Sequence, residues 1–284
     1  MTPPPHRAPA PQPAPGGLAT FFTMTFGISW GAWGLAYLAG ADLTQSLVLT
    51  LFMLGGSGPT LAALVLRIAG RRSPRLAEGR RLLLWAPAAL VLGALPAVAA
   101  AYLVPLLGTP GVGGSEVTAA LAAGGGPLLF VLSTLVTGPL SEEFGWRGFA
   151  QPRLRRRFSP LATSAVLGSV WGAWHLPLFF LQGTWHESVG LASPEALLIL
   201  LGAIPLSAAA WFVSERLRGG VPAAVLIHAA GNGAMALFPP VTFTAGLVFI
   251  GTLFAVGTLA LVAGRGNAPR SQLREAKAPL PASV

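Results

Sequence analysis

Two adjacent carboxylates and two imidazoles stand within or at the end of long apolar stretches of the chain. They are Glu142, Glu143, His175 and His228. A charged side chain at the centre of a membrane-spanning helix costs on the order of 3 kcal/mol on insertion scales, so such residues are functional by default. Carboxylates and imidazoles are also the groups that activate water. The chain is therefore expected to be a membrane protein that carries hydrolytic chemistry among its helices.

The first motif is Ser-Glu-Glu-Phe-Gly-Trp-Arg-Gly, residues 141–148. On a helix, Glu143 and Arg147 lie four residues apart and share one face, in the favourable order with the acid first. Glu142 points about 100° away from Glu143. Pairing with Arg147 would neutralise Glu143 and leave Glu142 to act as a base. A solvated helix end in a cytoplasmic loop would explain the same residues without chemistry.

The second motif is Trp171-Gly-Ala-Trp-His175. A lone buried histidine is more often a hydrogen-bonded core residue than a catalyst. Trp171 lies one turn before His175 on the same face, and its indole is interpreted as packing. The pair Gly168 and Gly172 has the spacing that lets two helices approach closely, which could help to build a site near His175.

The third motif is His228-Ala-Ala-Gly-Asn232. His228 and Asn232 project from one face, with small residues between them. Two donors held side by side suit an oxyanion stabiliser, and a neutral histidine can equally bind a metal. A polar contact between helices is the simpler alternative. Because the three motifs lie on three separate apolar runs, a purely structural explanation of all of them is difficult.

The elements that must position these residues are apolar runs of membrane-spanning length. The chain has 284 residues, of which 53% are apolar and 10% charged, whereas soluble domains carry about 25% charged residues. A spanning helix needs about 20 apolar residues. The sequence therefore predicts an all-α polytopic membrane protein of about eight transmembrane helices, with the active site inside the bundle. The runs are 18–38, 47–68, 82–107, 127–150, 158–181, 194–213, 221–238 and 243–263.

The charges alternate between the connectors of these runs. All 18 Lys and Arg residues lie in the two tails or in the second, fourth and sixth connectors. The positive-inside rule then predicts an even number of spans, with both termini cytoplasmic and the protein in the cell membrane. The net charge of +9 is explained by these connectors, so nucleic acid is not an expected partner. His186, Glu187 and Glu195 fall in an outward connector and are interpreted as solvated.

The tails frame a single membrane domain. Residues 1–17 are rich in proline and predicted to be disordered. Residues 18–264 are predicted to form the transmembrane domain, with the motifs in its core at 127–238, and residues 265–284 to form a cytoplasmic tail. The chain has no cysteine, which excludes a disulfide framework and a thiolate metal site.

Taken together, the three motifs resemble those of the CPBP family of intramembrane proteases. This family includes the CAAX proteases and bacteriocin-processing enzymes and is also called the ABI family. The order of the motifs, their placement on three spans and the Arg-Gly and His-Leu-Pro-Leu sequences that follow them all agree with it. Trp171 and Trp146 depart from the pattern, because the family usually has Phe at both positions.

The resemblance implies an intramembrane endopeptidase that cuts a peptide or protein substrate at or in the bilayer. It also implies roles for six side chains: Glu142 would activate the attacking water, Glu143 and Arg147 would support it, His175 would orient the water or bind a metal, and His228 and Asn232 would stabilise the oxyanion. Members of the family also act without proteolysis, so a catalytically silent membrane partner is an alternative. A transporter or channel that uses the same buried residues is another.

The role of metal is left open by the sequence. Glu142, His175 and His228 could bind zinc with a fourth position open for water. Asn232 is a poor zinc ligand but a good oxyanion donor, which favours a metal-free reaction. With straight helices, Glu142 and His228 would lie about 10–12 Å from the cytoplasmic side and His175 about 25 Å from it, so one site requires tilted or broken helices.

Overall fold

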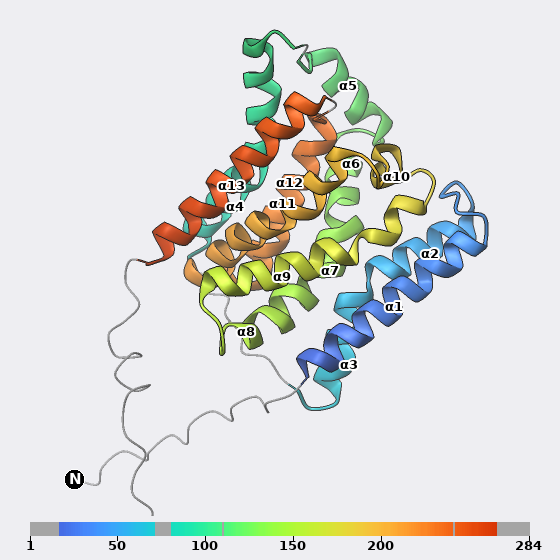
Figure 1. Cartoon of the computed structure of the whole chain (residues 1–284), viewed down its shortest axis with the longest axis vertical. Helices are drawn as coiled ribbons and strands as arrows, with labels where there is room; N and C mark the ends of the chain where they lie inside the picture. Colours follow the sequence, from blue (N-terminus) through green and yellow to red (C-terminus); the bar gives the residue numbers. More distant parts are fainter. Residues whose placement is uncertain (1–16, 72–80, 110, 241, 266–284) are drawn as a thin grey trace, which may run out of the picture.

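Helices dominate the computed structural model, which describes residues 17–71, 81–109, 111–240 and 242–265. The predicted tails, apart from Gly17 and Arg265, and most of the second connector lie outside these residues. The only β feature within them is an isolated bridge between Asp42 and Gln182, so the all-α prediction is confirmed. The helices are α1 (Leu18–Leu38), α2 (Ser46–Gly56), α3 (Gly58–Ile68), α4 (Leu82–Leu103), α5 (Gly114–Ala123), α6 (Pro127–Leu135), α7 (Ser141–Gly145), α8 (Gln151–Leu154), α9 (Pro160–Trp174), α10 (Trp185–Val189), α11 (Pro194–Trp211), α12 (Gly220–Leu237) and α13 (Phe243–Arg265); Figure 1 shows their arrangement.

Several of these helices are long and apolar enough to cross a membrane. Four described stretches qualify by themselves, Leu82–Leu107, Pro194–Arg216, Gly220–Leu237 and Phe243–Arg265, and the count rises to six if each of two bent pairs is one span. The chain is thus a multi-pass membrane protein, but the predicted count of eight is not confirmed. For example, α9 has 15 residues, so it is about 22 Å long, shorter than a hydrocarbon core of about 30 Å.

The arginine-bearing connectors meet at one end of the bundle. Arg153 donates from Nη2 to the carbonyl oxygen of Arg71 at 3.0 Å, and Arg155 pairs with Glu215 at 2.9 Å, so the second, fourth and sixth connectors touch. We call this the arginine end and define it by eight of the described arginines of these connectors: Arg67, Arg71, Arg153, Arg155, Arg156, Arg157, Arg216 and Arg218.

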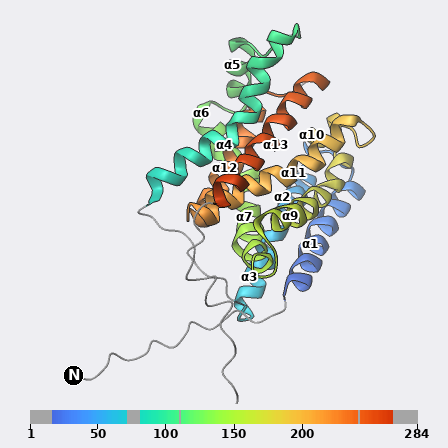
Figure 2. The same cartoon turned by 60° about the vertical axis from the view of Figure 1, so that its left-hand side comes forward.

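The connectors without Lys or Arg gather at the other end of the bundle. The first and fifth connectors are joined there by the bridge between Asp42 and Gln182 and by the Leu43 N–H, which donates to the Gln182 carbonyl at 3.3 Å. Figure 1 shows α3 and α8 on the lower side of the molecule and α5 and α10 on the upper side, and Figure 2 keeps α3 apart from α5 and α10. We call this second end the opposite end.

The stretch that carries the first motif is a series of short, broken helices. A π-helical segment, η3 (Val136–Leu140), precedes α7, and a second one, η4 (Trp146–Ala150), follows it. The helix breaks in η3 because Gly138 has φ 126° and ψ −77°, a conformation that glycine adopts without steric cost. Pro139 adds to the break because it has no N–H to donate. The break lets α7 start at a new angle in the middle of the bundle.

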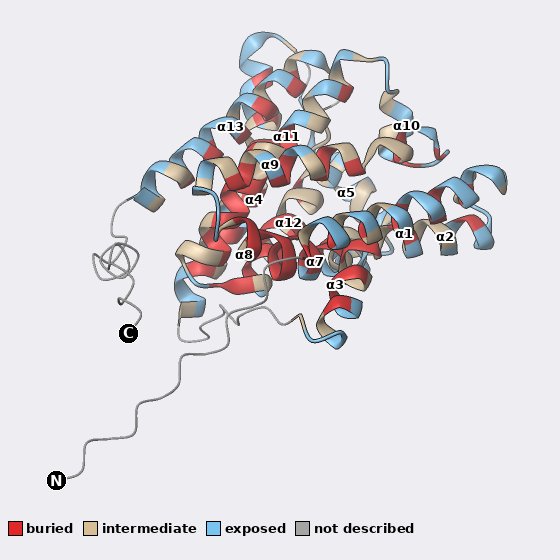
Figure 3. Cartoon of the chain, turned by 60° about the horizontal axis from the view of Figure 1, so that its bottom comes forward, coloured by how far each residue is buried: buried red, intermediate tan, exposed pale blue. Residues whose placement is uncertain are grey.

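Close helix contacts surround α7 and α9. Buried residues are concentrated around α7, α8 and α12 (Figure 3). A Cβ atom on Gly168 would overlap the backbone at Ile204, and one on Gly172 would overlap the carbonyl oxygen of Leu200. The predicted close approach beside His175 is therefore confirmed, with α11 as the neighbouring helix.

Candidate active site

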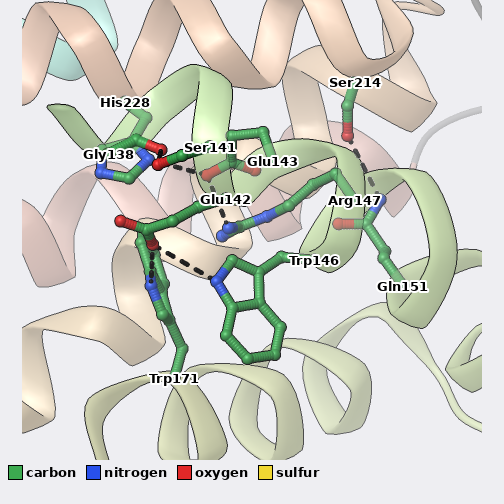
Figure 4. Close-up of polar contacts among 10 residues, drawn as sticks. All are labelled: Gly138, Ser141, Glu142, Glu143, Trp146, Arg147, Gln151, Trp171, Ser214 and His228. Carbon is green, nitrogen blue, oxygen red and sulfur yellow. Dashed lines mark hydrogen bonds and ion pairs between the residues drawn. The ribbon is translucent and has the colours of Figure 1, made fainter. Parts of the chain in front are cut away.

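Glu142 is held by two indole donors. Its carboxylate oxygen Oε2 accepts hydrogen bonds from Trp171 Nε1 at 2.7 Å and from Trp146 Nε1 at 3.3 Å (Figure 4). Trp146 lies one turn further along the same chain segment, whereas Trp171 comes from α9. The interpretation of Trp171 as packing alone is therefore wrong. Glu142 is only 5% exposed. Because both indoles donate to Oε2, the carboxylate is fixed in position and its other oxygen, Oε1, remains available for another partner.

Glu143 binds two cations or potential cations at once. Its Oε1 lies 2.9 Å from Arg147 Nη1 and 2.8 Å from His228 Nδ1. The predicted pairing with Arg147 is thus present, and it extends to His228 on α12. A carboxylate on Nδ1 selects the tautomer with the proton there, so the other ring nitrogen, Nε2, is free to act in the site. Glu143 supports His228 directly, which the sequence did not predict.

A space of atomic size lies between Glu142, His228 and Asn232. A Cβ atom built on Gly138 would lie 3.3 Å from Glu142 Oε1, 3.5 Å from Asn232 Nδ2 and 3.8 Å from His228 Nε2. One small group at this point would touch an oxygen that can accept a proton, the Asn232 amide nitrogen, which donates, and His228 Nε2, which donates when the ring is protonated on both nitrogens. A reacting centre needs such a point within reach of both base and donors. Gly138 leaves the space open because it has no side chain.

His175 lies next to this group but is not hydrogen-bonded to it. Its Nδ1 is 2.8 Å from the backbone oxygen of Trp171, the residue whose indole binds Glu142. Its side chain lines the same cavity as Glu142 and His228. With straight helices, Glu142 and His175 were expected at different depths in the membrane. The broken helix before α7 and the end of α9 at Trp174 bring them to one site.

His186 was expected to be solvated, but its side chain is only partly exposed. The fifth connector folds back so that the His186 ring stacks on His175, with centroids 5.3 Å apart and an interplanar angle of 18°. Burial, reinforced by the neighbouring imidazole of His175, lowers the pKa of His186 to about 3, so the ring is neutral near pH 7. The signal in the sequence is the adjacent Trp185, an aromatic residue that contacts His186 edge-on at 5.6 Å.

The predicted site residues line or adjoin one cavity of about 1020 Å³. Glu142, His175, His228 and Asn232 are part of its wall, and Glu143 lies behind His228. Such a volume is at the upper limit for ligand pockets. The rest of the wall is mostly apolar, with residues such as Leu178, Leu198, Ile199, Met235, Phe249 and Leu253. We call this space the central cavity.

The side chains as arranged do not offer zinc three ligands. No group of three or more His, Cys, Asp or Glu side chains within the described residues could hold a metal ion. Glu142 Oε2 is occupied by two indoles and His228 Nδ1 by Glu143. A zinc site made of Glu142, His175 and His228 therefore stays a prediction that requires rearrangement.

The chain is similar to known proteins over part of its length, and the family match covers the part that carries the site. Residues 124–234 match the family described as type II CAAX prenyl endopeptidase Rce1-like. Over 103 residues the chain is 29% identical to "CAAX prenyl protease 2" of Methanococcus maripaludis, which is 36% of this chain and 37% of that protein. The chain thus matches little more than a third of this relative's length. All three motifs fall within residues 124–234, and the resemblance of this segment to the CPBP family, which the motifs indicated, is confirmed.

Proposed function

We propose that the chain is an intramembrane endopeptidase of the CAAX type that hydrolyses a peptide bond in the central cavity. The observation that carries this proposal is the space beside Gly138. It lies within 3.8 Å of Glu142 Oε1, Asn232 Nδ2 and His228 Nε2, so a water or a scissile carbonyl there would meet a base and two donors together. The proposed catalytic unit is the membrane domain 18–264 with its core at 127–238, flanked by tails without catalytic residues.

In the proposed reaction Glu142 is the general base. Its Oε1 takes a proton from a water molecule, and the oxygen of that water attacks the carbonyl carbon of the peptide. The resulting oxyanion accepts hydrogen bonds from the Asn232 amide and from the protonated His228 imidazole. When the C–N bond breaks, Glu142 returns its proton to the amine nitrogen. One water is consumed, and Glu142 ends ionised, as it began.

The remaining residues act through these three. Glu143 holds the His228 ring through Nδ1, and Arg147 holds the Glu143 carboxylate in position. His175 faces the same cavity and is proposed to orient the water. No step depends on a metal.

We further propose that both termini and the arginine end face the cytoplasm and that the protein lies in the cell membrane. The support for this orientation is the clustering of the arginine-bearing connectors at one end of the bundle, because basic connectors are retained on the cytoplasmic side. The substrate is a peptide or protein segment that reaches the bilayer.

The test uses the purified full-length chain in detergent. A fluorescence-quenched peptide that ends in a prenylated cysteine, two aliphatic residues and a variable residue is a suitable first probe, because the relative in Methanococcus maripaludis is a CAAX prenyl protease. A mixture of apolar quenched peptides without a prenyl group is the second. We expect cleavage of at least one probe by the wild type and by Glu116→Gln, a change at an exposed residue. Glu142→Gln should be inactive, although its unfolding temperature should equal that of the wild type.

Two results would contradict the proposal. Near-normal turnover by Glu142→Gln would show that Glu142 is not the general base. Absence of cleavage in every probe, together with a proton or ion flux in proteoliposomes that Glu142→Gln abolishes, would instead indicate a transporter.

A further inference from the structure

The connectors that form the arginine end carry positive charge that the chain itself cannot balance. Apart from Arg147, which pairs with Glu143 in the site, they hold twelve arginines and only two acids, Glu78 and Glu215, which gives a net charge of +10. The two tails add five basic residues and one acid, Glu275. The remaining six acids belong to the site or to the opposite end. Whatever ion pairs form at the arginine end, most of its charge is therefore compensated by anions from outside the chain.

The fold brings these like charges together. Arg153 Nη2 donates to the carbonyl oxygen of Arg71 at 3.0 Å, and Arg67, Arg71 and Arg156 lie close enough to Arg153 for their charges to repel it. Retention of basic connectors on one side of a membrane requires their charge but not their contact. Contact between them raises the electrostatic free energy of the folded chain, so an anion that binds there stabilises the fold.

Three arginines of this end have exposed side chains: Arg156, Arg157 and Arg218. The ion pair between Arg155 and Glu215, at 2.9 Å, joins the fourth connector, which carries the first two, to the sixth, which carries the third. The exposed arginines therefore surround one junction between two connectors. A guanidinium group binds two oxygens of one phosphate at once, so phosphate is the anion that this junction fits.

The backbone at Arg218 supports a function for its side chain. Arg218 has φ 61°, in the left-handed region, which is unfavourable for a residue with a Cβ atom. Glycine adopts this conformation without that cost and is the usual residue where a helix ends in this way. Strained backbone of this kind is concentrated at functional sites. An arginine at a position suited to glycine therefore indicates a role for its cation.

Exposed apolar side chains border the arginines. Phe158 directly follows Arg157, Leu161 lies in the first turn of α9, and both are exposed. At the end of α3, exposed Ile68 directly follows Arg67. Phosphate and alkyl chains occur together at the surface of a bilayer. A phospholipid can therefore contact both kinds of side chain, whereas free phosphate contacts only the arginines.

We propose that the arginine end binds the headgroup phosphate of an anionic phospholipid through Arg156, Arg157 and Arg218. The acyl chains of this lipid lie along Phe158 and Leu161 at the start of α9. Clusters of about four to eight basic residues beside a membrane helix are typical of sites for anionic lipids. The inference does not depend on the proposed hydrolysis or on the side of the membrane that the arginine end faces.

The bound lipid also stabilises the segment that carries the first motif. Arg67 Nη2 donates to the Gly148 carbonyl at 3.0 Å, and Arg153 Nη1 donates to the Phe149 carbonyl at 2.9 Å. Both carbonyls belong to η4, which follows the two glutamates of the site. Partial neutralisation of the cluster weakens the repulsion between the two guanidinium groups that hold η4. We therefore expect thermal unfolding at a higher temperature when anionic lipid is present.

The test measures lipid binding to the purified full-length chain in a neutral detergent. The protein is titrated with phosphatidylglycerol and, separately, with phosphatidylcholine of the same acyl chains, and bound lipid is counted by native mass spectrometry. Phosphatidylglycerol should bind more tightly. Each arginine near an anionic headgroup contributes about 5-fold in affinity, so Arg156→Gln combined with Arg157→Gln should lose about 30-fold. Arg7→Gln combined with Arg270→Gln removes the same charge from the tails and should keep the affinity of the wild type.

Arg218→Gly tests the third contact without disturbing the backbone. Glycine adopts φ 61° readily, so the variant should fold, while its affinity for phosphatidylglycerol should fall about 5-fold. A cation at the end of a helix also interacts with the helix dipole. Unchanged affinity in Arg218→Gly would assign Arg218 to that structural role and refute its place in the lipid site.

Three results would overturn the lipid site. The first is equal affinity for the two lipids, and the second is an equal loss of affinity in the connector pair and the tail pair of variants. The third is a rise in unfolding temperature with inorganic phosphate or glycerol phosphate as large as that with phosphatidylglycerol, which would make the ligand a soluble phosphate. None of these measurements involves cleavage, so a protein that binds phosphatidylglycerol but cleaves no peptide would refute the hydrolase alone.

Discussion

The two hydrogen bonds to Glu142 make a sharp prediction for Trp171→Phe. The change keeps an aromatic ring and removes the N–H that lies 2.7 Å from Glu142 Oε2. A hydrogen bond to a charged group contributes about 1.5–3 kcal/mol, and one pH unit corresponds to about 1.4 kcal/mol. The donor stabilises the ionised carboxylate, which is the form that acts as a base. Without it, the ionised carboxylate should lose about that much stabilisation, which corresponds to a loss of activity of roughly 10-fold to 150-fold on the low-pH side of the profile.

The assay is the pH dependence of kcat/KM for the probe peptide. The low-pH limb of the Trp171→Phe profile should move to higher pH, with a loss of that size at a fixed low pH, and activity should recover at alkaline pH. Trp146→Phe removes the longer bond of 3.3 Å and should move the limb less. Trp174→Phe is the matched control, because its buried indole N–H has no partner among the described residues. An unmoved limb in Trp171→Phe, or a loss of rate that is the same at every pH, would refute the reasoning.

Four further predictions concern the surrounding site. Arg147→Ala leaves the Glu143 carboxylate buried without its cation, so thermal unfolding in detergent should show a loss of about 3–5 kcal/mol, and unchanged stability would contradict the pairing. Asn232→Ala should lower kcat by about 10²–10³ with little change in KM; a pure KM effect would make Asn232 a binding residue instead. Gly138→Ala puts a methyl group where the reacting atom is proposed to sit and forces alanine to φ 126°, so turnover should be abolished, and wild-type kinetics would disprove the space as the reaction centre. Activity should survive a chelator, with far less than one metal per chain in the purified protein; stoichiometric zinc that restores a chelated enzyme would overturn the metal-free reaction.

Local features of the site were accessible from the sequence, and contacts between distant segments were not. Glu143 and Arg147 pair because four residues bring side chains together on any helix, so spacing alone predicts the contact. The bond from His228 to Glu143 joins residues 85 positions apart, and no periodic pattern contains that information. The same holds for Trp171, because periodicity predicts which face it occupies but not that Glu142 lies opposite.

For the fold as well, local features could be predicted from the sequence, whereas the arrangement of distant segments could not. The first apolar run coincides with α1, Leu18–Leu38, because hydrophobicity determines where a membrane helix begins and ends. The depth mismatch between His175 and Glu142 came from the assumption of straight helices. The break at Gly138 depends on backbone geometry that composition does not encode, although the Gly-Pro pair at 138–139 is a known breaker signal.

The π-helical turn η4 (Trp146–Ala150) determines how the motif region responds to a change in chain length. A π turn holds one residue more than an α turn, so deletion of one residue there would allow an ordinary helix to form. Because the deleted residue is the extra one of the bulge, the segment after it would keep its phase relative to the glutamates. Gln151 would still face Ser214, its partner at 3.2 Å, and Arg153 the backbone of Arg71. A deletion in a regular helix such as α9 would instead rotate everything after it by about 100°. A relative with the same three motifs and an interval one residue shorter after the glutamates is therefore expected to keep the same anchors.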